Sequence, residues 1–409
     1  MRVLLSTWGS RGDVEPLAGL AVRLRELGAE ALVAAPPDEE FAALLARVGV
    51  PMVPCGPSVR SVVTGTGTPD PFRLAAELVA ARFGVLAEAA EGCDAVLATG
   101  LMPAGVRSVA EKRGIPYVFA CFHPFGLPSP RFLPQRRPGK PSPADETDNR
   151  VLWRHDAERV DALYGEVLNT HRAAIGLPPV PSVRDHVYTE RPWLAADPVL
   201  GPWQDATDFD LVQTGAWFLP DDRPLPPELE AFLAAGEPPV YVGFGSMAMR
   251  TAPDLARTTV EAVRARGRRV LLGSGWAGLA AVDEQDDCFV VGEVNHQALF
   301  ARVAAVVHHG GAGTTAKAAL AGAPQVIVPQ IVDQPHWAAR VAELGIGAAH
   351  QGPTPTTASL STALAAALTP GTAQRAHEVA ATIRTDGTTV AAKLLTKLLT
   401  ELTEGRRIG

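Results

Sequence analysis

The residues best suited to bind a ligand lie in one short segment of the second half of the chain. An apolar run at 303–307 is followed by the letters HHGGAGTT at 308–315 and then by the spacing of a helix. Glycines let the backbone approach a ligand closely, and the N–H groups at a helix start attract phosphate. Two threonine hydroxyls and an imidazole add further donors. Strand, histidine, glycines, threonines and helix, in this order, predict a diphosphate-binding loop.

The same segment disfavours two other chemistries. It lacks the lysine of a P-loop and does not match GxGxxG, which argues against an NAD-dependent oxidoreductase. His308 and His309 are a poor metal pair because adjacent strand residues point to opposite faces, so we expect one imidazole to meet the ligand and the other to pack. The DxD spacing at 208–210 falls in a polar stretch and is interpreted as an exposed loop. We therefore expect no bound metal.

The elements that must position this loop alternate between strand and helix. Short apolar runs, bounded by glycine or proline, are separated by apolar residues at helical spacing, such as those between 17 and 27. This alternation predicts an α/β fold with parallel, doubly wound sheets. The expected strands lie at 3–6, 31–34, 94–98, 115–120, 240–244, 269–272, 289–291, 303–308 and 325–328.

Two proline-rich stretches interrupt the alternation. Residues 123–147 contain seven prolines, which predicts a long surface loop that either grips a substrate or is a plain insertion. Residues 219–239 contain six more around one short helix and are interpreted as an inter-domain linker. Two α/β domains joined in this way would leave a cleft in which a ligand binds.

Composition excludes several classes of protein. The 409 residues include 37 Lys and Arg against 44 Asp and Glu, a net charge of −7 that argues against nucleic-acid binding. The four cysteines form no CxxC pair, so a disulfide framework is not expected and a reducing cytoplasm fits. The first residues do not resemble a signal peptide, and no apolar run approaches the roughly 18 residues of a membrane span.

Several segments together resemble the bacterial glycopeptide-antibiotic glycosyltransferases of the vancomycin and teicoplanin type. They include GSRGDVEPLAGL, VYVGFGSM, GEVNHQALF, HHGGAGTT and DQPHWAARVAELGIG, and the resemblance covers essentially the whole chain. It implies the GT-B fold of family 1, in which two Rossmann-like domains face each other across a cleft. The expected parts are an acceptor-binding domain (1–215), a linker (216–239), a nucleotide-sugar domain (240–385) and a last helix (386–409) that packs back on the first domain.

The resemblance also implies a donor site. The diphosphate would meet the glycine-rich loop and Ser246, which is expected to end the first strand of the second domain. The base would meet backbone near Val294, and an acid–amide pair would hold the sugar. Glu293 stands where plant relatives have a tryptophan that stacks on the base, which leaves uracil and thymine open. The residues implied for the nucleotide sugar are Ser10, Arg11, Gly12, Ser246, Val294, His309, Gly311, Gly313, Thr314, Thr315, Asp333 and Gln334.

The catalytic candidate that the resemblance implies is Asp13. Many members of the family have GHxxP where this chain has Gly12-Asp13-Val14-Glu15-Pro16, and their histidine removes the acceptor proton. A carboxylate at this place can act as the base of an inverting transfer. From spacing alone, Asp13 could instead be the N-cap of the following helix, a role worth about 1 kcal/mol. Asp333 is the second candidate for the base.

The acceptor is expected to meet the first domain. Trp8 and Phe125 are candidate acceptor-binding residues, although Trp8 could equally pack against the first helix. Three basic residues of the proline-rich loop (Arg136, Arg137 and Lys140) are interpreted as a solvated face that could also meet an acidic acceptor group.

The expected reaction is transfer of a hexose from a UDP- or dTDP-sugar to a phenolic hydroxyl of a glycopeptide aglycone. The nucleotide sugar is a substrate, and neither a cofactor nor a metal is expected. Three alternatives remain at this point: another natural-product aglycone such as a macrolide or polyketide, an epimerase that turns over its donor without an acceptor, and a silent helper protein, which would be expected to lose the diphosphate residues.

Overall fold

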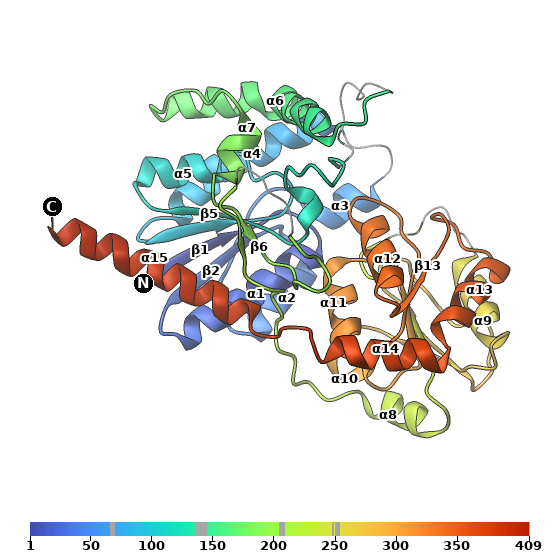
Figure 1. Cartoon of the computed structure of the whole chain (residues 1–409). Helices are drawn as coiled ribbons and strands as arrows, with labels where there is room; N and C mark the ends of the chain where they lie inside the picture. The colour runs from blue at the N-terminus through green and yellow to red at the C-terminus, as the bar shows by residue number, and fades with distance from the viewer. Residues whose placement is uncertain are drawn as a thin grey trace. The chain divides into compact units, whose positions relative to one another are not determined.

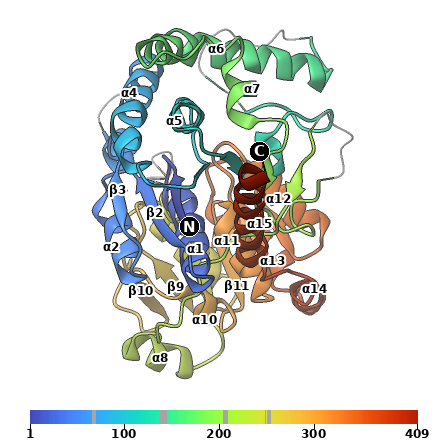
Figure 2. The ribbon, with the colours of Figure 1, turned by 90° about the vertical axis from the view of Figure 1, so that its left-hand side faces the viewer.

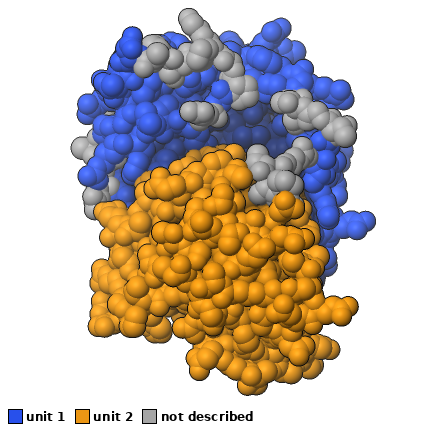
Figure 3. All heavy atoms as spheres, turned by 90° about the vertical axis from the view of Figure 1, so that its right-hand side faces the viewer, with its two compact units in different colours: residues 1–198, 202–219, 384–409 blue, residues 199–201, 220–383 orange. Residues whose placement is uncertain are grey.

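The computed structural model describes residues 1–65, 70–135, 137, 145–203, 209–247, 249 and 254–408 (Figure 1). The chain forms two compact units, coloured separately in Figure 3. Unit 1 comprises residues 1–198, 202–219 and 384–409, and unit 2 comprises residues 199–201 and 220–383. In the described part of the chain, no helix is both long enough and apolar enough to span a membrane.

Unit 1 is built on a seven-stranded parallel sheet with the order β3-β2-β1-β4-β5-β6-β7. Its strands are β1 (Arg2–Ser6), β2 (Glu30–Ala35), β3 (Met52–Pro54), β4 (Ala95–Ala98), β5 (Tyr117–Cys121), β6 (Trp193–Leu194) and β7 (Val212–Gln213). Its helices are α1 (Arg11–Glu26), α2 (Glu39–Arg47), α3 (Val59–Thr64), α4 (Pro71–Ala89), α5 (Val106–Arg113), α6 (Asn149–Ala174), α7 (Val183–Tyr188) and α15 (Gly387–Ile408), with a 3₁₀ turn at Pro124–Gly126.

Helices cover both faces of this sheet, as the alternation along β1 shows. Val3 and Leu5 are buried in one apolar cluster with α1, α2 and α15, while Leu4 is buried in another with α4 and α5. Helix α15 lies beside α1 (Figure 2) and buries apolar side chains such as Leu395. It begins at Gly387, where a Cβ atom would lie 2.2 Å from the carbonyl oxygen of Ala216, so the return of the chain requires glycine there.

Unit 2 is built on a six-stranded parallel sheet with the order β10-β9-β8-β11-β12-β13. Its strands are β8 (Val240–Gly243), β9 (Val270–Gly273), β10 (Cys288–Val291), β11 (Ala305–His308), β12 (Gln325–Ile327) and β13 (Gly347–Ala349). Its helices are α8 (Pro227–Ala234), α9 (Leu255–Arg264), α10 (His296–Phe300), α11 (Ala312–Leu320), α12 (Gln334–Glu343), α13 (Thr357–Ala367) and α14 (Pro370–Ala380).

Each sheet has one point at which the strand order reverses. In unit 1, β1 lies between β2 and β4; in unit 2, β8 lies between β9 and β11. Ligands of open parallel sheets bind at such points, beyond the carboxyl ends of the strands, because the chain leaves the two neighbouring strands in opposite directions and opens a crevice. The topology therefore predicts that ligands bind at the loops that follow β1 and β4 in unit 1, and at the loops that follow β8 and β11 in unit 2.

The predicted α/β fold with two doubly wound sheets is confirmed, and the differences lie in its irregular parts. The stretch interpreted as a linker belongs to unit 2 from Pro220 onward, because Leu229 of α8 is fully buried in that unit's core. Within 123–147, the described residues include the 3₁₀ turn and residues 145–147, which precede α6. Residues 136 and 138–144 lie outside the described part of the chain, as does Asp208 of the DxD spacing. Strands β3, β6, β7 and β13 are only two or three residues long and show no readable alternation, so they were not expected.

Candidate functional site

The residues predicted for the nucleotide sugar in unit 2 lie beyond the carboxyl ends of neighbouring strands. Val294 follows β10, Ser246 follows β8, His309 follows β11, and Asp333 follows β12. Neighbouring strands are about 4.8 Å apart, so these loops span on the order of 19 Å along one edge of the sheet. This order agrees with the predicted one, in which the base end of an extended nucleotide sugar would lie at β10, the diphosphate at the crevice between β8 and β11, and the sugar at β12.

The two histidines of the glycine-rich loop have separate environments. His308 is fully buried; its Nε2 lies 2.9 Å from Oε1 of Gln325, and its Nδ1 accepts a hydrogen bond of 3.1 Å from the N–H of Gly310. Burial lowers the pKa of His308 to about 4, so its ring is neutral at pH 7. Both nitrogens are therefore occupied within the protein, and His308 is the imidazole that packs.

His309 is the partly exposed imidazole of the pair. Its Nδ1 is buried without a hydrogen-bond partner in the described structure, and a Cβ on Gly245 would lie 3.3 Å from its Cε1. Burial, followed by the neighbouring His308, lowers the pKa of His309 to about 3. His309 is therefore a neutral ring at the crevice between β8 and β11, where it can donate a hydrogen bond but carries no charge.

The start of helix α11 supplies backbone donors to the same crevice. Its N-cap is Gly311, which has no side chain to occupy the first N–H groups, and a Cβ there would lie 2.7 Å from Nε2 of His309. Gly313 is exposed, with open space where a Cβ would stand, and Thr314 is half-buried. Free N–H groups beside a helix dipole form an anion site.

One residue predicted for this loop is placed differently. Thr315 is fully buried, and its hydroxyl donates a hydrogen bond of 2.9 Å to the carbonyl of Gly311. Such a bond to the preceding turn is a common local alternative for threonine in a helix. We therefore treat Thr315 as a packing residue and leave it out of the donor contacts.

Ser246 lies in a tight turn and not at the end of a strand. Strand β8 ends at Gly243, and the turn that follows has Gly245 at φ 54°, a conformation that favours glycine. The carbonyl of Gly245 accepts a hydrogen bond of 2.8 Å from the N–H of Trp276, which fixes the turn against the loop after β9. The hydroxyl of Ser246 is half-buried beside the crevice where the sheet reverses.

The acid–amide pair begins helix α12. Asp333 is its N-cap residue, and Oδ2 of Asp333 accepts a hydrogen bond of 2.7 Å from Nε1 of Trp337. Gln334 is buried, and its Oε1 accepts from the N–H groups of Gln330 (2.8 Å) and Ile331 (3.1 Å). The oxygen of Gln334 thus braces its own loop, and the grip of the acid–amide pair on sugar hydroxyls stays a prediction.

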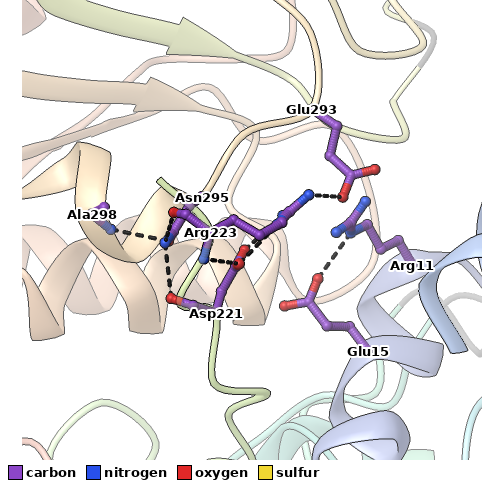
Figure 4. A network of polar contacts seen from close by, with 7 residues as sticks. All are labelled: Arg11, Glu15, Asp221, Arg223, Glu293, Asn295 and Ala298. Carbon is purple, nitrogen blue, oxygen red and sulfur yellow. Dashed lines mark hydrogen bonds and ion pairs between the residues drawn. The ribbon is translucent and has the colours of Figure 1, made fainter. Parts of the chain in front are cut away.

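In unit 1, the loop after β1 carries the catalytic candidate. Helix α1 is capped by Ser10, whose hydroxyl accepts a hydrogen bond of 3.2 Å from the N–H of Gly12. The interpretation of Asp13 as the N-cap is therefore wrong, and Asp13 lies in the first turn, half-buried. A Cβ on Gly9 would lie 2.1 Å from Oδ2 of Asp13, so the carboxylate lies over the loop at the crevice of this sheet. Arg11 forms an ion pair of 2.8 Å with Glu15 (Figure 4).

Both acceptor-binding candidates pack inside unit 1. Trp8 is only 6% exposed, and its Nε1 donates a hydrogen bond of 2.8 Å to the carbonyl of Pro57. Phe125 is equally buried, stacks on His123 and meets Phe132 edge-on. Trp8 is thus packed, as one interpretation expected, although the hydrogen bond and the close approach of its indole are to Pro57 and Gly56 and not to the first helix. Both rings are buried and expose little surface to an acceptor.

The expected solvated face of the proline-rich loop is also corrected. Arg137 is largely covered, with 12% of its side chain exposed, and forms an ion pair of 2.8 Å with Asp156, whose side chain is fully buried. A guanidinium that is largely removed from water requires a partner carboxylate. That partner, Asp156, lies on α6, and the prolines of 123–147 do not predict this contact. Arg136 and Lys140 lie outside the described residues.

Three polar residues near these loops are not among those predicted from the sequence. His123 follows β5 at the same edge of the sheet as the loop after β1, with Nε2 3.2 Å from Nε2 of Gln135. Asn295 caps α10, and Arg223 comes from the stretch interpreted as a linker. An asparagine before a short apolar run is a helix-start signal that could have identified Asn295. No local pattern marks the other two.

Among the described residues, no group of three or more His, Cys, Asp or Glu side chains could hold a metal ion.

Comparison with known proteins gives the family. Residues 280–396 match the model of the erythromycin biosynthesis protein CIII-like C-terminal domain. The chain is 57% identical to the vancomycin aglycone glucosyltransferase of Amycolatopsis orientalis, with 97% of each chain covered. It is 52% identical to the dTDP-epi-vancosaminyltransferase of the same organism, with 93% of each covered.

A solved structure shares the fold. The glycotransferase of kitacinnamycin superposes with a TM-score of 0.73 at 21% identity, over 97% of this chain and 98% of that one. Together with the identity to the Amycolatopsis enzymes over almost the whole length, this shows that the chain belongs to the family 1 GT-B glycosyltransferases of the bacterial glycopeptide-antibiotic type.

Proposed function

We propose that this enzyme transfers a hexose from a UDP- or dTDP-sugar to a phenolic hydroxyl of a glycopeptide aglycone, with inversion at the anomeric carbon. The observation that carries the donor half is the crevice between β8 and β11. There His309 lies beside Gly245, the residue before Ser246, and beside Gly311 at the N-terminus of α11. The acceptor half rests on the Amycolatopsis relative whose name specifies a vancomycin aglycone. The name of the second relative, a dTDP-epi-vancosaminyltransferase, specifies a dTDP-linked donor and supports the donor half.

In the proposed reaction, Asp13 removes the proton of the acceptor hydroxyl as its oxygen attacks the anomeric carbon. The new C–O bond forms while the bond from that carbon to the diphosphate oxygen breaks, so the nucleoside diphosphate leaves with the electron pair. The proton ends on the Asp13 carboxylate, which releases it to solvent. Asp333 remains the second candidate for the base, although one of its oxygens is engaged by Trp337.

The leaving group is stabilised without a metal in this proposal. The N–H groups at the start of α11 and the neutral ring of His309 donate hydrogen bonds to the diphosphate oxygens as their charge increases. His308 cannot complete a metal pair because Gln325 and Gly310 occupy its two nitrogens.

The test is product mass after incubation of one glycopeptide aglycone with a panel of UDP- and dTDP-hexoses, with and without a chelator. We expect one added hexose from at least one donor, and the same rate with the chelator. Donor turnover without any aglycone would favour the epimerase instead. Transfer that stops with the chelator would remove the metal-independent mechanism, and binding of neither UDP nor dTDP would contradict the donor site.

A further inference from the structure

The segment with which the chain enters unit 2 is tied to the loop after β10. Asn295, which is only 4% exposed, donates from Nδ2 to the carbonyls of Asp221 (2.8 Å) and Arg223 (2.9 Å). Its Oδ1 accepts a hydrogen bond of 3.0 Å from the N–H of Ala298 (Figure 4). One buried amide thus caps α10 and holds the backbone of 221–223, more than 70 residues away in sequence.

Arg223 makes a second tie to the same loop. Its Nε and Nη2 bind the carboxylate of Asp221 at 2.8 and 2.6 Å, and its Nη1 reaches Glu293 at 3.2 Å. The two hydrogen bonds to Asp221 fix the plane of the Arg223 guanidinium, so Nη1 of Arg223 points in a fixed direction. The hydrogen bonds that Arg223 donates to Asp221, and the nearby charge of Glu293, raise the pKa of Arg223, which stays charged. Glu293 is therefore held immediately before Val294.

Apolar packing holds the two segments as well. Leu225 and Val294 are both buried and belong to one cluster with Leu229 of α8. The loop 292–295 is thus bound to 221–225 by a capping amide, an ion pair and an apolar contact. A loop that contacts its ligand through backbone atoms cannot adapt by moving a side chain. Contacts with other segments of the protein must therefore fix its position.

We infer that 221–225 is part of the donor site, with Arg223 and Asn295 as positioning residues for the loop that meets the pyrimidine base. This inference rests on the proposed function, because it takes loop 292–295 as the base-binding loop. In place of a ring that stacks on the base, this chain has a carboxylate, Glu293, held by Arg223. Affinity for a pyrimidine nucleoside diphosphate then depends on residues that do not touch it.

The test compares Arg223→Ala with a matched control. Arg302 forms an ion pair of 2.6 Å with Glu230, which joins α8 to the residues after α10 and is exposed on both sides. We expect Arg223→Ala to raise the Kd of UDP and dTDP roughly tenfold, since a charged hydrogen-bonded pair is lost, and Arg302→Ala to change it less than twofold. Kd would be measured by calorimetry on the whole protein, with thermal unfolding as the check on folding.

Two further variants separate positioning from stability. Arg223→Lys keeps the charge without the planar fork and should recover only part of the affinity. Asn295→Asp keeps the oxygen that caps α10 but loses both donors to 221–223, and should weaken nucleotide binding as Arg223→Ala does. In steady-state kinetics, both Arg223→Ala and Asn295→Asp should raise KM for the donor while kcat and KM for the aglycone stay within about twofold.

The outcomes are distinguishable. A folded Arg223→Ala enzyme with unchanged nucleotide Kd, or an equal loss in Arg302→Ala, overturns the inference and leaves the proposed function intact. A native enzyme that binds neither UDP nor dTDP overturns the proposed function itself.

Discussion

Asp13 and His309 show how a single residue's environment decides its chemistry. Asp13 does not cap its helix because Ser10 does, so its carboxylate is placed over Gly9 at the crevice of the first sheet. His309 is neutral because desolvation, followed by the neighbouring imidazole of His308, lowers its pKa. One side chain is thus suited to accept a proton and the other to donate a hydrogen bond.

Replacing Asp13 tests the proposed base. Asp13→Asn keeps the shape of the side chain but cannot accept a proton, so we expect turnover to fall about 100-fold or more while the Kd of the nucleotide stays nearly constant. Single-turnover rates and calorimetry measure the two quantities. Glu26→Gln, an exposed carboxylate at the other end of α1, is the control and should leave both unchanged. Unchanged turnover in Asp13→Asn would remove Asp13 from this role.

His308 predicts a pH dependence of stability. Its pKa is lowered to about 4 by burial, while the unfolded chain has an ordinary histidine near 6.5. The unfolded state therefore binds more protons between these values, and the free energy of unfolding should fall as pH decreases from about 6.5 to about 4, by up to roughly 3 kcal/mol from this group. Denaturant unfolding at pH 7, 5.5 and 4 measures it.

The control for this pH dependence is His308→Gln, which cannot titrate. Its stability at pH 7 is expected to be lower, but the slope with pH should be shallower than in the native enzyme. Equal slopes would show that His308 does not carry this dependence.

At the scale of elements, the donor loops are arranged by strand order and held by local contacts. The loop before α12 shows this, because Gln334 accepts hydrogen bonds from two N–H groups of its own loop. Val332 in that loop has φ 56°, a strained conformation for a β-branched residue that persists only where the surroundings enforce it. The glycine-rich loop also depends on close local contacts, because a methyl group added at Gly311 would collide with the ring of His309.

Gly311→Ala tests the start of α11. The added Cβ would lie 2.7 Å from Nε2 of His309, so the imidazole must move away from the crevice. We expect nucleotide affinity to fall roughly tenfold, the loss of one or two hydrogen bonds, with little change in Tm. Gly371→Ala, in the first turn of α14 with open space around its Cβ, is the control and should bind normally. Normal binding by Gly311→Ala as well would contradict this account of the loop.

At the scale of the molecule, the chain leaves unit 1, builds unit 2 and returns. Helix α15 completes the core of unit 1 at the end of the sequence, with Ala391, Ala392 and Leu395 buried against the first strands and helices. Of the twelve residues predicted for the nucleotide sugar, by contrast, nine lie in unit 2, and the other three (Ser10, Arg11 and Gly12) lie at the start of α1. Stability of unit 1 and nucleotide affinity should therefore respond to different substitutions.

Leu395→Ala tests this separation. Removing a fully buried leucine leaves a cavity, which should lower the free energy of unfolding of unit 1 by about 2–5 kcal/mol. The Kd for UDP and dTDP should stay within about twofold, because no contact in the proposed donor site is altered. Calorimetric unfolding followed by nucleotide titration provides both values. A large loss of affinity in a folded variant would show that the two properties are not separable.

The sequence by itself determined the fold class, the glycine-rich loop and the family. Strand and helix periods are local properties, and the order strand, histidine, glycines and helix needs only neighbours in the chain. The interpretation of His308 and His309 as one packing and one ligand-facing ring followed from the same local geometry, although its ligand stays a prediction.

Only the tertiary structure decided which polar groups remain available to a ligand. Arg137 is occupied by Asp156, and Trp8 by the carbonyl of Pro57. Asn295 holds a segment more than 70 residues away. A hydrogen-bonding group that finds a partner inside the protein is lost to ligands, and that partner is brought close by the packing of distant segments, which no local pattern in the sequence records.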